Sequence, residues 1–235
     1  MLEIVKKIHK NIPVLRSILT TIWFNFHYLP FRQAIKLPIL LYKPKLIQCD
    51  GKIILKRPAK YGMIRLGFHV TSIYPNTGIT WENKGGTVRF NGHASIGNDS
   101  YLSFGRKTTV EFGDDFISSA GLKLISYREM KFGNHTSLGW EVLIMDTNFH
   151  PLFDLNKKVY KKASGSISIG EYNWFGTQCK IMHSVHTPDR CIFGMGSVVT
   201  RNCEMKSYCV MGGNPVKILS ENVIRDYDHD REDDI

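Results

Sequence analysis

A histidine followed by proline, His150–Pro151, interrupts an otherwise regular sequence in the stretch MDTNFHPLFD at residues 145–154. Asp146 stands four residues before this histidine and Asp154 four residues after it. The unperturbed pKa of histidine lies near neutrality, so a neutral imidazole can accept a proton from a hydroxyl or an amine and later return it. We therefore predict that His150 is a general base. Asp146 could orient its ring by accepting a hydrogen bond from the second nitrogen, and a backbone carbonyl would serve equally well.

The sequence around this histidine repeats a short unit from about residue 60 onward. In each unit an apolar residue precedes glycine, and a few polar residues then lead to the next apolar residue, as in SIGNDSYL, KFGNHTSL and IFGMGSVV. No helical period runs through the region, and Gly, Asn and Asp stand where chain corners are expected. The pattern predicts a solenoid whose coils of about eighteen residues each hold three short strands. An antiparallel β-sandwich is the alternative, but it predicts longer strands with a stronger apolar–polar alternation.

Three motifs near the C-terminal end occur in a fixed order. Ile167–Gly170 is followed by Trp174–Gly176, then by GMGSVVT at 194–200, and last by GNPVK at 213–217. In this order the motifs resemble the end of hexapeptide-repeat acyltransferases of the left-handed parallel β-helix class. The resemblance extends over roughly residues 88–220 and implies an all-β fold, a left-handed parallel β-helix solenoid.

The same resemblance divides the chain into three parts. Residues 61–220 would form the β-helix domain, with an excursion loop at 147–166. Residues 1–60 lie before it and are expected to form a basic, amphipathic and partly helical N-terminal extension. Residues 221–235 would form a short acidic C-terminal tail.

Sugar acetyltransferases of this class carry their catalytic histidine in an H-P motif, on a loop that leaves the solenoid, and a tryptophan follows at a fixed interval. Here Trp174 follows His150 by twenty-four residues, which resembles the galactoside-type enzymes. The resemblance implies an acetyl-CoA-dependent O-acetyltransferase that acts on a carbohydrate, such as a bacterial surface polysaccharide or its precursor. Where those enzymes hold the substrate or the oxyanion with an asparagine, this sequence has Ser118 or Ser119, so the identity of the acceptor stays open.

The resemblance also implies a homotrimer in which acetyl-CoA lies in a groove between neighbouring subunits. Trp174 would flank the pantetheine arm, backbone groups nearby would bond its amides, and hydroxyl and basic side chains would approach the nucleotide and its phosphates. The residues placed at the amides are Gly176, Thr177, Gly194 and Met195, and those placed at the phosphates are Thr200, Arg201 and Lys217. For the glycines, corner geometry alone is the other explanation.

Two further functions fit the sequence. The same fold supports N-acylation of an amino sugar nucleotide, and a β-helix without its chemistry could serve as a scaffold at a membrane surface. A scaffold has no reason to keep the Trp174 interval together with the GNPVK closure. No third ligand joins His183 and His186 at a zinc-ligand spacing, so no metal is expected. The basic residues accompany no nucleic-acid-binding motif, so no nucleic acid is expected.

The formal net charge of +10 is concentrated near the N-terminus, where residues 1–60 hold twelve Lys and Arg against Glu3 and Asp50. This head suits an anionic partner such as a membrane surface. Its apolar stretch at 18–31 is too short to span a bilayer, which takes roughly 20 residues, but it could lie in an interface or pack on the main domain. Five cysteines without a C-x-x-C pair, and no signal peptide, predict a cytoplasmic protein that can contact the inner face of the membrane peripherally.

Overall fold

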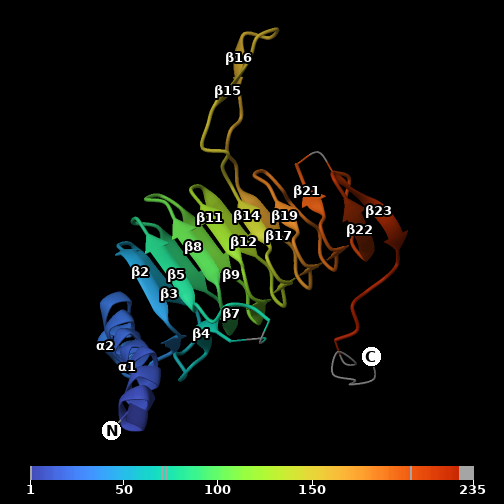
Figure 1. The fold of residues 1–235 in the computed structure, drawn as a ribbon. Helices are drawn as coiled ribbons and strands as arrows, with labels where there is room; N and C mark the ends of the chain where they lie inside the picture. Colours follow the sequence, from blue (N-terminus) through green and yellow to red (C-terminus); the bar gives the residue numbers. More distant parts are fainter. Residues whose placement is uncertain (1, 70, 72, 202, 228–235) are drawn as a thin grey trace.

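The computed structural model describes residues 2–69, 71, 73–201 and 203–227, with side chains from Leu15 onward. The chain forms a parallel β-helix of stacked coils that has three faces (Figure 1). Each regular coil contributes one strand to each of three sheets, named here A, B and C. The predicted solenoid is confirmed. Among the described residues, no helix is both long and apolar enough to cross a lipid bilayer.

The strands of each sheet follow one another from coil to coil in parallel register. Sheet A holds β1 (Ile39–Leu41), β4 (Ile64–Phe68), β7 (Ala94–Gly97), β10 (Phe116–Ser118), β13 (Ser137–Leu138), β18 (Trp174–Phe175), β20 (Ile192–Phe193) and β22 (Cys209–Gly213), and ends with the antiparallel β23 (Val216–Glu221). Sheet B holds β2 (Pro44–Cys49), β5 (Ile79–Asn83), β8 (Ser100–Phe104), β11 (Lys123–Ser126), β14 (Leu143–Met145), β19 (Lys180–Ile181) and β21 (Val198–Val199). Sheet C holds β3 (Lys52–Leu55), β6 (Thr87–Phe90), β9 (Thr109–Phe112), β12 (Glu129–Phe132) and β17 (Ile167–Ile169).

The interior is built by stacking like residues from successive coils, because parallel register brings equivalent positions together. Phe112 lies between Phe90 and Phe132, with ring centroids 5.1 and 5.5 Å apart. Phe175 and Phe193 stack in the same way at 4.3 Å. All five rings are buried. The repeated apolar residue of the sequence is therefore the inward-facing residue of each strand, and burial of these rings holds adjacent coils together.

A long helix, α1 (Leu2–Tyr28), closes the N-terminal end of the stack. Its inner face supplies hydrogen bonds to the exposed edge of β1. The Asn25 amide donates to the Ile39 carbonyl at 2.7 Å, and the Ile39 N–H donates to the Asn25 oxygen at 3.1 Å. The Leu41 N–H donates to the Thr21 hydroxyl at 3.0 Å. These polar side chains satisfy backbone groups that the first strand would otherwise leave unpaired.

The solenoid begins at Ile39, earlier than the boundary at residue 61 that the sequence indicated. Strands β1 to β3 pair in parallel with β4 to β6 and so form a complete first coil. This coil contains many lysines and few corner residues of the Gly and Asn type, so its repeat is not visible in the sequence. The helical part of the extension, which was predicted, consists of α1 and the short α2 (Phe31–Ala34). Of the acidic tail, residues 228–235 lie outside the described part.

One excursion leaves the coils between β14 and β17. It contains a hairpin of two antiparallel strands, β15 (Leu152–Asp154) and β16 (Val159–Lys161), which projects well beyond the body of the solenoid (Figure 1). The excursion departs from the edge where sheet B turns into sheet C. This is the segment that carries His150.

Candidate active site

His150 lies exposed near the start of the excursion, where the chain has just left the coil. Two backbone hydrogen bonds close the stem below it: the Asn148 N–H donates to the Ala163 carbonyl at 2.8 Å, and the Gly165 N–H donates to the Asp146 carbonyl at 3.0 Å. The His150 N–H donates to the Asn148 carbonyl at 2.7 Å, which tightens the turn. The imidazole is thus held out from the coil surface on a stem that is fixed at its base.

Asp146 does not orient the His150 ring, so that prediction is wrong. Its carboxylate is buried and accepts hydrogen bonds from the Ser126 hydroxyl at 2.8 Å and from the N–H groups of Tyr127 and Arg128 at 2.7 and 2.8 Å. Burial raises the pKa of Asp146, although these bonds oppose the shift. Within the described residues, no hydrogen bond joins it to His150. Asp146 instead fixes the excursion to the preceding coil.

A second histidine, His183, lies at the base of the excursion and was not assigned to the site from the sequence. Its Nε2 is 3.2 Å from the side-chain nitrogen of Asn148, and its Nδ1 is 3.2 Å from the Ser184 hydroxyl. Burial lowers the pKa of His183, and the positive charges of Arg201 and Lys162 lower it further. The neutral ring therefore connects the next coil to the stem that carries His150. Nothing in the sequence indicated this position, because His183 and Asn148 lie thirty-five residues apart.

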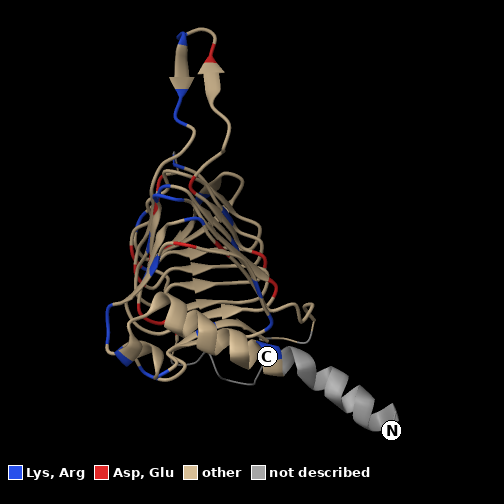
Figure 2. Ribbon diagram, turned by 90° about the vertical axis from the view of Figure 1, so that its left-hand side faces the viewer, with Lys and Arg blue, Asp and Glu red and all other residues tan. Residues whose placement is uncertain are grey.

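A groove of about 680 Å³ runs beside the stem of the excursion. Phe149, the residue before His150, contacts Tyr127 in the groove wall, with ring centroids 5.0 Å apart. Lys107, Arg128 and Lys162 are among the groove's lining residues, and Glu129 is the one acidic residue among them. Figure 2 shows Lys and Arg positions on the hairpin stem and close to its base. The surface next to His150 is therefore suited to a ligand that carries negative charge.

The four residues predicted to bond the pantetheine amides lie together along the edge between sheets A and B. Gly176 and Thr177 turn this corner in one coil, and Gly194 and Met195 turn it in the next; Gly196 N–H donates to the Thr177 carbonyl at 2.8 Å. Their role toward a cofactor stays a prediction. What the structure establishes is that they occupy the same corner in two successive coils, and this corner is called the glycine ridge below.

The two glycines on this ridge differ in what the coil requires of them. A Cβ on Gly176 would come within 2.9 Å of the Met195 nitrogen, so stacking of the coils alone explains a glycine there. A Cβ on Gly194 would meet only the Met211 carbonyl oxygen, at 3.5 Å, which is ordinary contact. The fold does not demand a glycine at Gly194. Close approach of a ligand to the backbone is therefore a reason for glycine at this position.

Trp174 lies on the outer side of sheet A, with 36% of its surface exposed, and not in the core. The guanidinium carbon of Arg225 lies 4.9 Å from the centroid of its ring, a cation–π geometry. The segment after β23 thus returns to cover part of the indole. Arg225 could not be placed here from the sequence, because its contact joins positions fifty-one residues apart.

Ser118 and Ser119, the two candidates for holding the acceptor, lie in different environments. Ser118 points into the coil and is buried, and its hydroxyl has no hydrogen-bond partner among the described residues. A substrate at the surface cannot reach it, so the prediction for Ser118 is wrong. Ser119 is half-buried at the corner between sheets A and B and stays a prediction.

Two of the three residues predicted for the nucleotide and its phosphates share one groove. Thr200 and Lys217 line a groove of about 460 Å³ near the C-terminal end, together with Cys203 and Glu204. Arg201 is exposed beside Thr200 but does not line this groove. The candidate residues therefore lie in three places, which are this groove and two edges of the solenoid. The excursion with His150 leaves the edge between sheets B and C, while the glycine ridge lies on the edge between sheets A and B.

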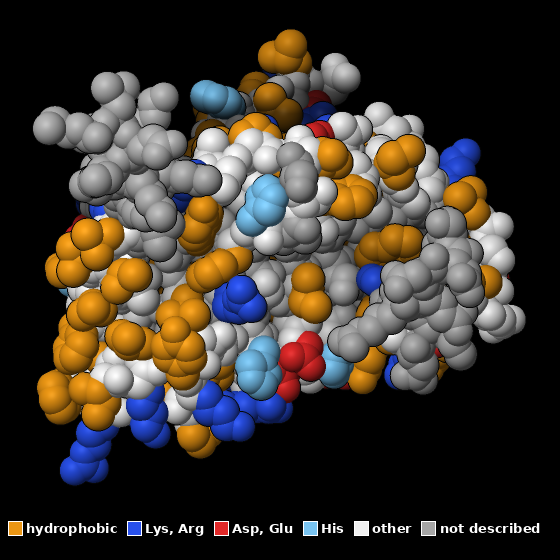
Figure 3. Space-filling view, turned by 60° about the horizontal axis from the view of Figure 1, so that its bottom comes forward, with side chains coloured by type: hydrophobic (Ala, Val, Ile, Leu, Met, Phe, Trp, Pro, Cys, Tyr) orange, Lys and Arg blue, Asp and Glu red, His pale blue; other side chains and the backbone are white. Residues whose placement is uncertain are grey.

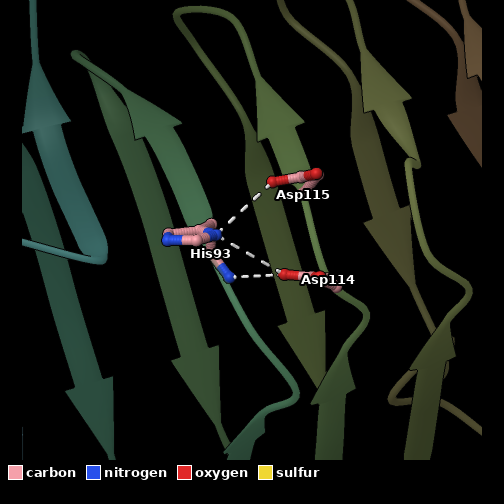
Figure 4. Close-up of side chains that lie close together, drawn as sticks. All are labelled: His93, Asp114 and Asp115. Carbon is pink, nitrogen blue, oxygen red and sulfur yellow. Dashed lines mark hydrogen bonds and ion pairs between the residues drawn. The ribbon is translucent and has the colours of Figure 1, made fainter. Parts of the chain in front are cut away.

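A separate cluster of His93, Asp114 and Asp115 was not noted in the sequence (Figure 4). The His93 Nδ1 is 3.7 Å from an oxygen of each aspartate. The Arg57 guanidinium lies 2.6 Å from Asp114, and the His93 N–H donates to the same carboxylate at 2.8 Å. Burial alone would raise the pKa of Asp114, but these two groups hold it below its usual value. An arginine already neutralises this carboxylate, so the cluster is a corner contact between coils and gives no reason to propose a metal.

No family model matches the chain. Over 126 residues it is 28% identical to the polysialic acid O-acetyltransferase of Escherichia coli O1:K1, a match that covers 53% of this chain and 38% of that protein. Over 138 residues it is 27% identical to the galactoside O-acetyltransferase of Lactococcus lactis subsp. lactis, with coverage of 57% and 65%. The chain thus spans less than two thirds of the length of these curated relatives.

A solved structure of the polySia specific acetyltransferase NeuO matches with a TM-score of 0.58 and 21% identity, over 82% of this chain and 74% of that one. The predicted left-handed parallel β-helix is confirmed by this likeness. The resemblance to acyltransferases of this class that the three motifs indicated is confirmed as well, by the two curated relatives and by this structure.

Proposed function

We propose that the chain is an acetyl-CoA-dependent O-acetyltransferase that acts on a carbohydrate, with His150 as its general base. His150 would take the proton from an acceptor hydroxyl as that oxygen attacks the thioester carbonyl carbon. The new C–O bond forms as the C–S bond breaks, and His150 would return the proton to the departing thiolate. The acceptor ester and free CoA are the products, so atoms and charge balance without a further reactant.

The observation that carries this proposal is the exposure of His150 on the excursion from the coils. Its stem is fixed by backbone hydrogen bonds, by buried Asp146 and by the contact of Phe149 with Tyr127. A general base needs this combination, because its ring must be accessible to the acceptor while its position stays constant. The two sequence relatives are both named as O-acetyltransferases, which is the same reaction, transfer of an acetyl group to a hydroxyl oxygen.

The ridge between sheets A and B supports acetyl-CoA as the donor. Met195 is exposed and Thr177 is half-buried on it, and within the described part of the chain Gly194 is free of a packing requirement. Trp174 offers an exposed aromatic face next to the ridge, and Lys217 could meet a phosphate from the groove near the C-terminal end. These residues fit a ligand with an amide-containing arm and an anionic end.

The basic groove beside His150 supports an acidic glycan as the acceptor. Three cations, Lys107, Arg128 and Lys162, line it against the single carboxylate of Glu129, and one relative is named for polysialic acid, whose sugar units carry carboxylates. A neutral galactoside, named for the other relative, would gain nothing from these charges. An acidic acceptor should therefore react faster than a neutral one, and the difference should shrink as salt is added.

The division of the candidate residues between two edges supports a homotrimer. A base on the edge between sheets B and C could meet a donor on the edge between sheets A and B if a second copy of the chain lies alongside. Each site would then draw His150 from one subunit and the glycine ridge from its neighbour.

The proposal is tested by titrating acetyl-CoA into the purified protein and by measuring transfer with a galactoside and with polysialic acid as acceptors. We expect saturable binding of acetyl-CoA that weakens with dephospho-CoA. His150→Ala should bind the donor as the native chain does, while its turnover should fall by about 100- to 10,000-fold.

The matched control is His186→Ala, an exposed histidine outside the site, which should keep native turnover. Absence of donor binding at millimolar concentration by the folded protein would overturn the proposal. Native turnover in His150→Ala would refute the role of that residue.

A further inference from the structure

The outer face of α1 is apolar and, in the part of the chain that the structure describes, no element covers it. Six residues at helical spacing lie on one side of it and are exposed, from 39% at Ile22 to 62% at Leu19. At about 100° per residue they cover roughly 140° of the helix circumference. The six are Leu15, Ile18, Leu19, Ile22, Trp23 and Phe26. Figure 3 shows hydrophobic side chains gathered over this end of the molecule.

The opposite face of the helix is fully engaged, so α1 cannot rotate to bury these residues. Thr21 and Asn25 hydrogen-bond to β1, and Phe24 is buried with its ring 5.3 Å from Trp81. The apolar face is therefore fixed outward, at the end of the solenoid. It continues onto α2, where Phe31 is 70% exposed and contacts Phe26 at 5.9 Å.

Positively charged side chains border this face. Arg16, Arg32 and Lys36 are exposed beside it, and between Glu3 and Asp50 the sequence contains no acidic residue. Figure 3 shows Lys and Arg side chains along the margin of the hydrophobic area. An apolar helix face bordered by cations matches the interface of an anionic bilayer, where acyl chains lie beneath negatively charged headgroups.

We infer that α1 and α2 dock the protein on an anionic lipid surface, with the outer face of α1 lying in the plane of the interface. Leu19 and Trp23 enter the boundary between headgroups and acyl chains, while Arg16 and Arg32 meet the headgroups. The solenoid then stands on the membrane by its N-terminal end. The hairpin β15–β16 projects from its side (Figure 1). This inference does not depend on the proposed transferase activity.

The test is flotation of the full-length protein with vesicles of phosphatidylcholine alone and of phosphatidylcholine mixed equally with phosphatidylglycerol. The native chain should float with the anionic vesicles, and each headgroup contact by Lys or Arg should contribute about fivefold to the partition coefficient. Leu19→Glu should lower the partition coefficient by at least about tenfold. Leu219→Glu is the matched control, because Leu219 is similarly exposed, at 67%, but lies at the other end of the solenoid.

Three results would overturn the inference. The native protein could stay with the aqueous fraction, or Leu19→Glu could float as well as the native chain. Leu19→Glu could also reduce the molecular mass in solution, which would make this face a contact between copies of the chain. A blue shift of tryptophan fluorescence on vesicle addition, lost in Trp23→Phe while flotation persists, would support insertion at this position.

Discussion

His183 makes the base of the excursion sensitive to pH. Because the pKa of His183 is lowered in the fold, the unfolded chain takes up a proton before the native chain does as pH falls through about 6.5. The free energy of unfolding should therefore fall over this range. We expect His183→Gln to lose less stability than the native chain between about pH 7.5 and pH 5.5, measured by thermal unfolding.

His186→Gln serves as the control for this prediction, since His186 is exposed and lies only three residues after His183. It should keep the pH dependence of the native protein. If the native chain and His183→Gln lost the same stability as the pH falls, protonation of His183 would not be the cause of the loss.

Gly194 and Gly176 allow the need for ligand binding to be distinguished from the need for close packing of the coils, because only Gly176 is required by packing. Gly194→Ala should leave the unfolding temperature unchanged, because its Cβ would make only an ordinary contact, but it should weaken acetyl-CoA binding by at least about tenfold. Gly176→Ala should lower stability, because its Cβ would press on the Met195 backbone. Calorimetric titration and thermal unfolding of both variants check this. Unchanged donor affinity in Gly194→Ala would remove that residue from the binding site.

At the level of single residues, the sequence predicted His150 correctly as an exposed loop residue but misjudged its surroundings. Asp146 and His150 are four residues apart, a spacing that brings side chains together on a helix. Here the chain is not helical, and it leaves the coil between these two residues. The partners of Asp146 come from Ser126, Tyr127 and Arg128, about one coil earlier. Contacts between neighbouring coils depend on the number of residues in a coil. They can be assigned only when it is known which residues occupy equivalent corners of the two coils.

Among the elements, α1 should contribute to stability through its bonds to β1. Asn25→Leu removes two hydrogen bonds to Ile39 and leaves two buried backbone groups unpaired. We expect a loss of about 2–4 kcal/mol in the free energy of unfolding. Denaturant unfolding checks this value.

Thr20→Val is the control on the same helix, because the bond recorded for the Thr20 hydroxyl in the described residues stays within α1, to the Arg16 carbonyl. Its effect should stay within about 0.5 kcal/mol. Equal stabilities of Asn25→Leu and Thr20→Val would mean that α1 does not support the first coil.

The repeat predicted the later coils well, because Gly, Asn and Asp mark their corners and apolar residues mark their strands. It missed the first coil, where Lys43 takes a left-handed backbone conformation without a typical corner residue. The sequence also indicated helices before the solenoid. It could not show which face of α1 packs inward, since that face carries Ser17, Thr21 and Asn25 and its outward face carries the apolar residues.

For the whole molecule, the two-edge arrangement predicts a trimer of about 81 kDa, three times the 26.9 kDa of one chain. His150→Ala and Trp174→Ala should each be inactive alone. Unfolded together and refolded as mixed trimers, they should recover about one quarter of native activity, because each site draws its two halves at random from the two variants. Light scattering and the acetyl-transfer assay check mass and recovery. A monomeric mass, or no recovery in mixed trimers, would contradict a site shared between subunits.

The hydrogen bonds from α1 to β1 have a consequence for how the stack ends. A bare terminal strand of a parallel sheet is a template onto which another copy of the same coil can add, and repeated addition gives a fibril. Asn25 and Thr21 occupy that template at one end. At the other end β23 runs antiparallel to β22, so a further parallel coil finds no matching register. Both ends of sheet A are thus closed to the addition of a further parallel strand, and the number of coils between them can vary without reopening either end of that sheet.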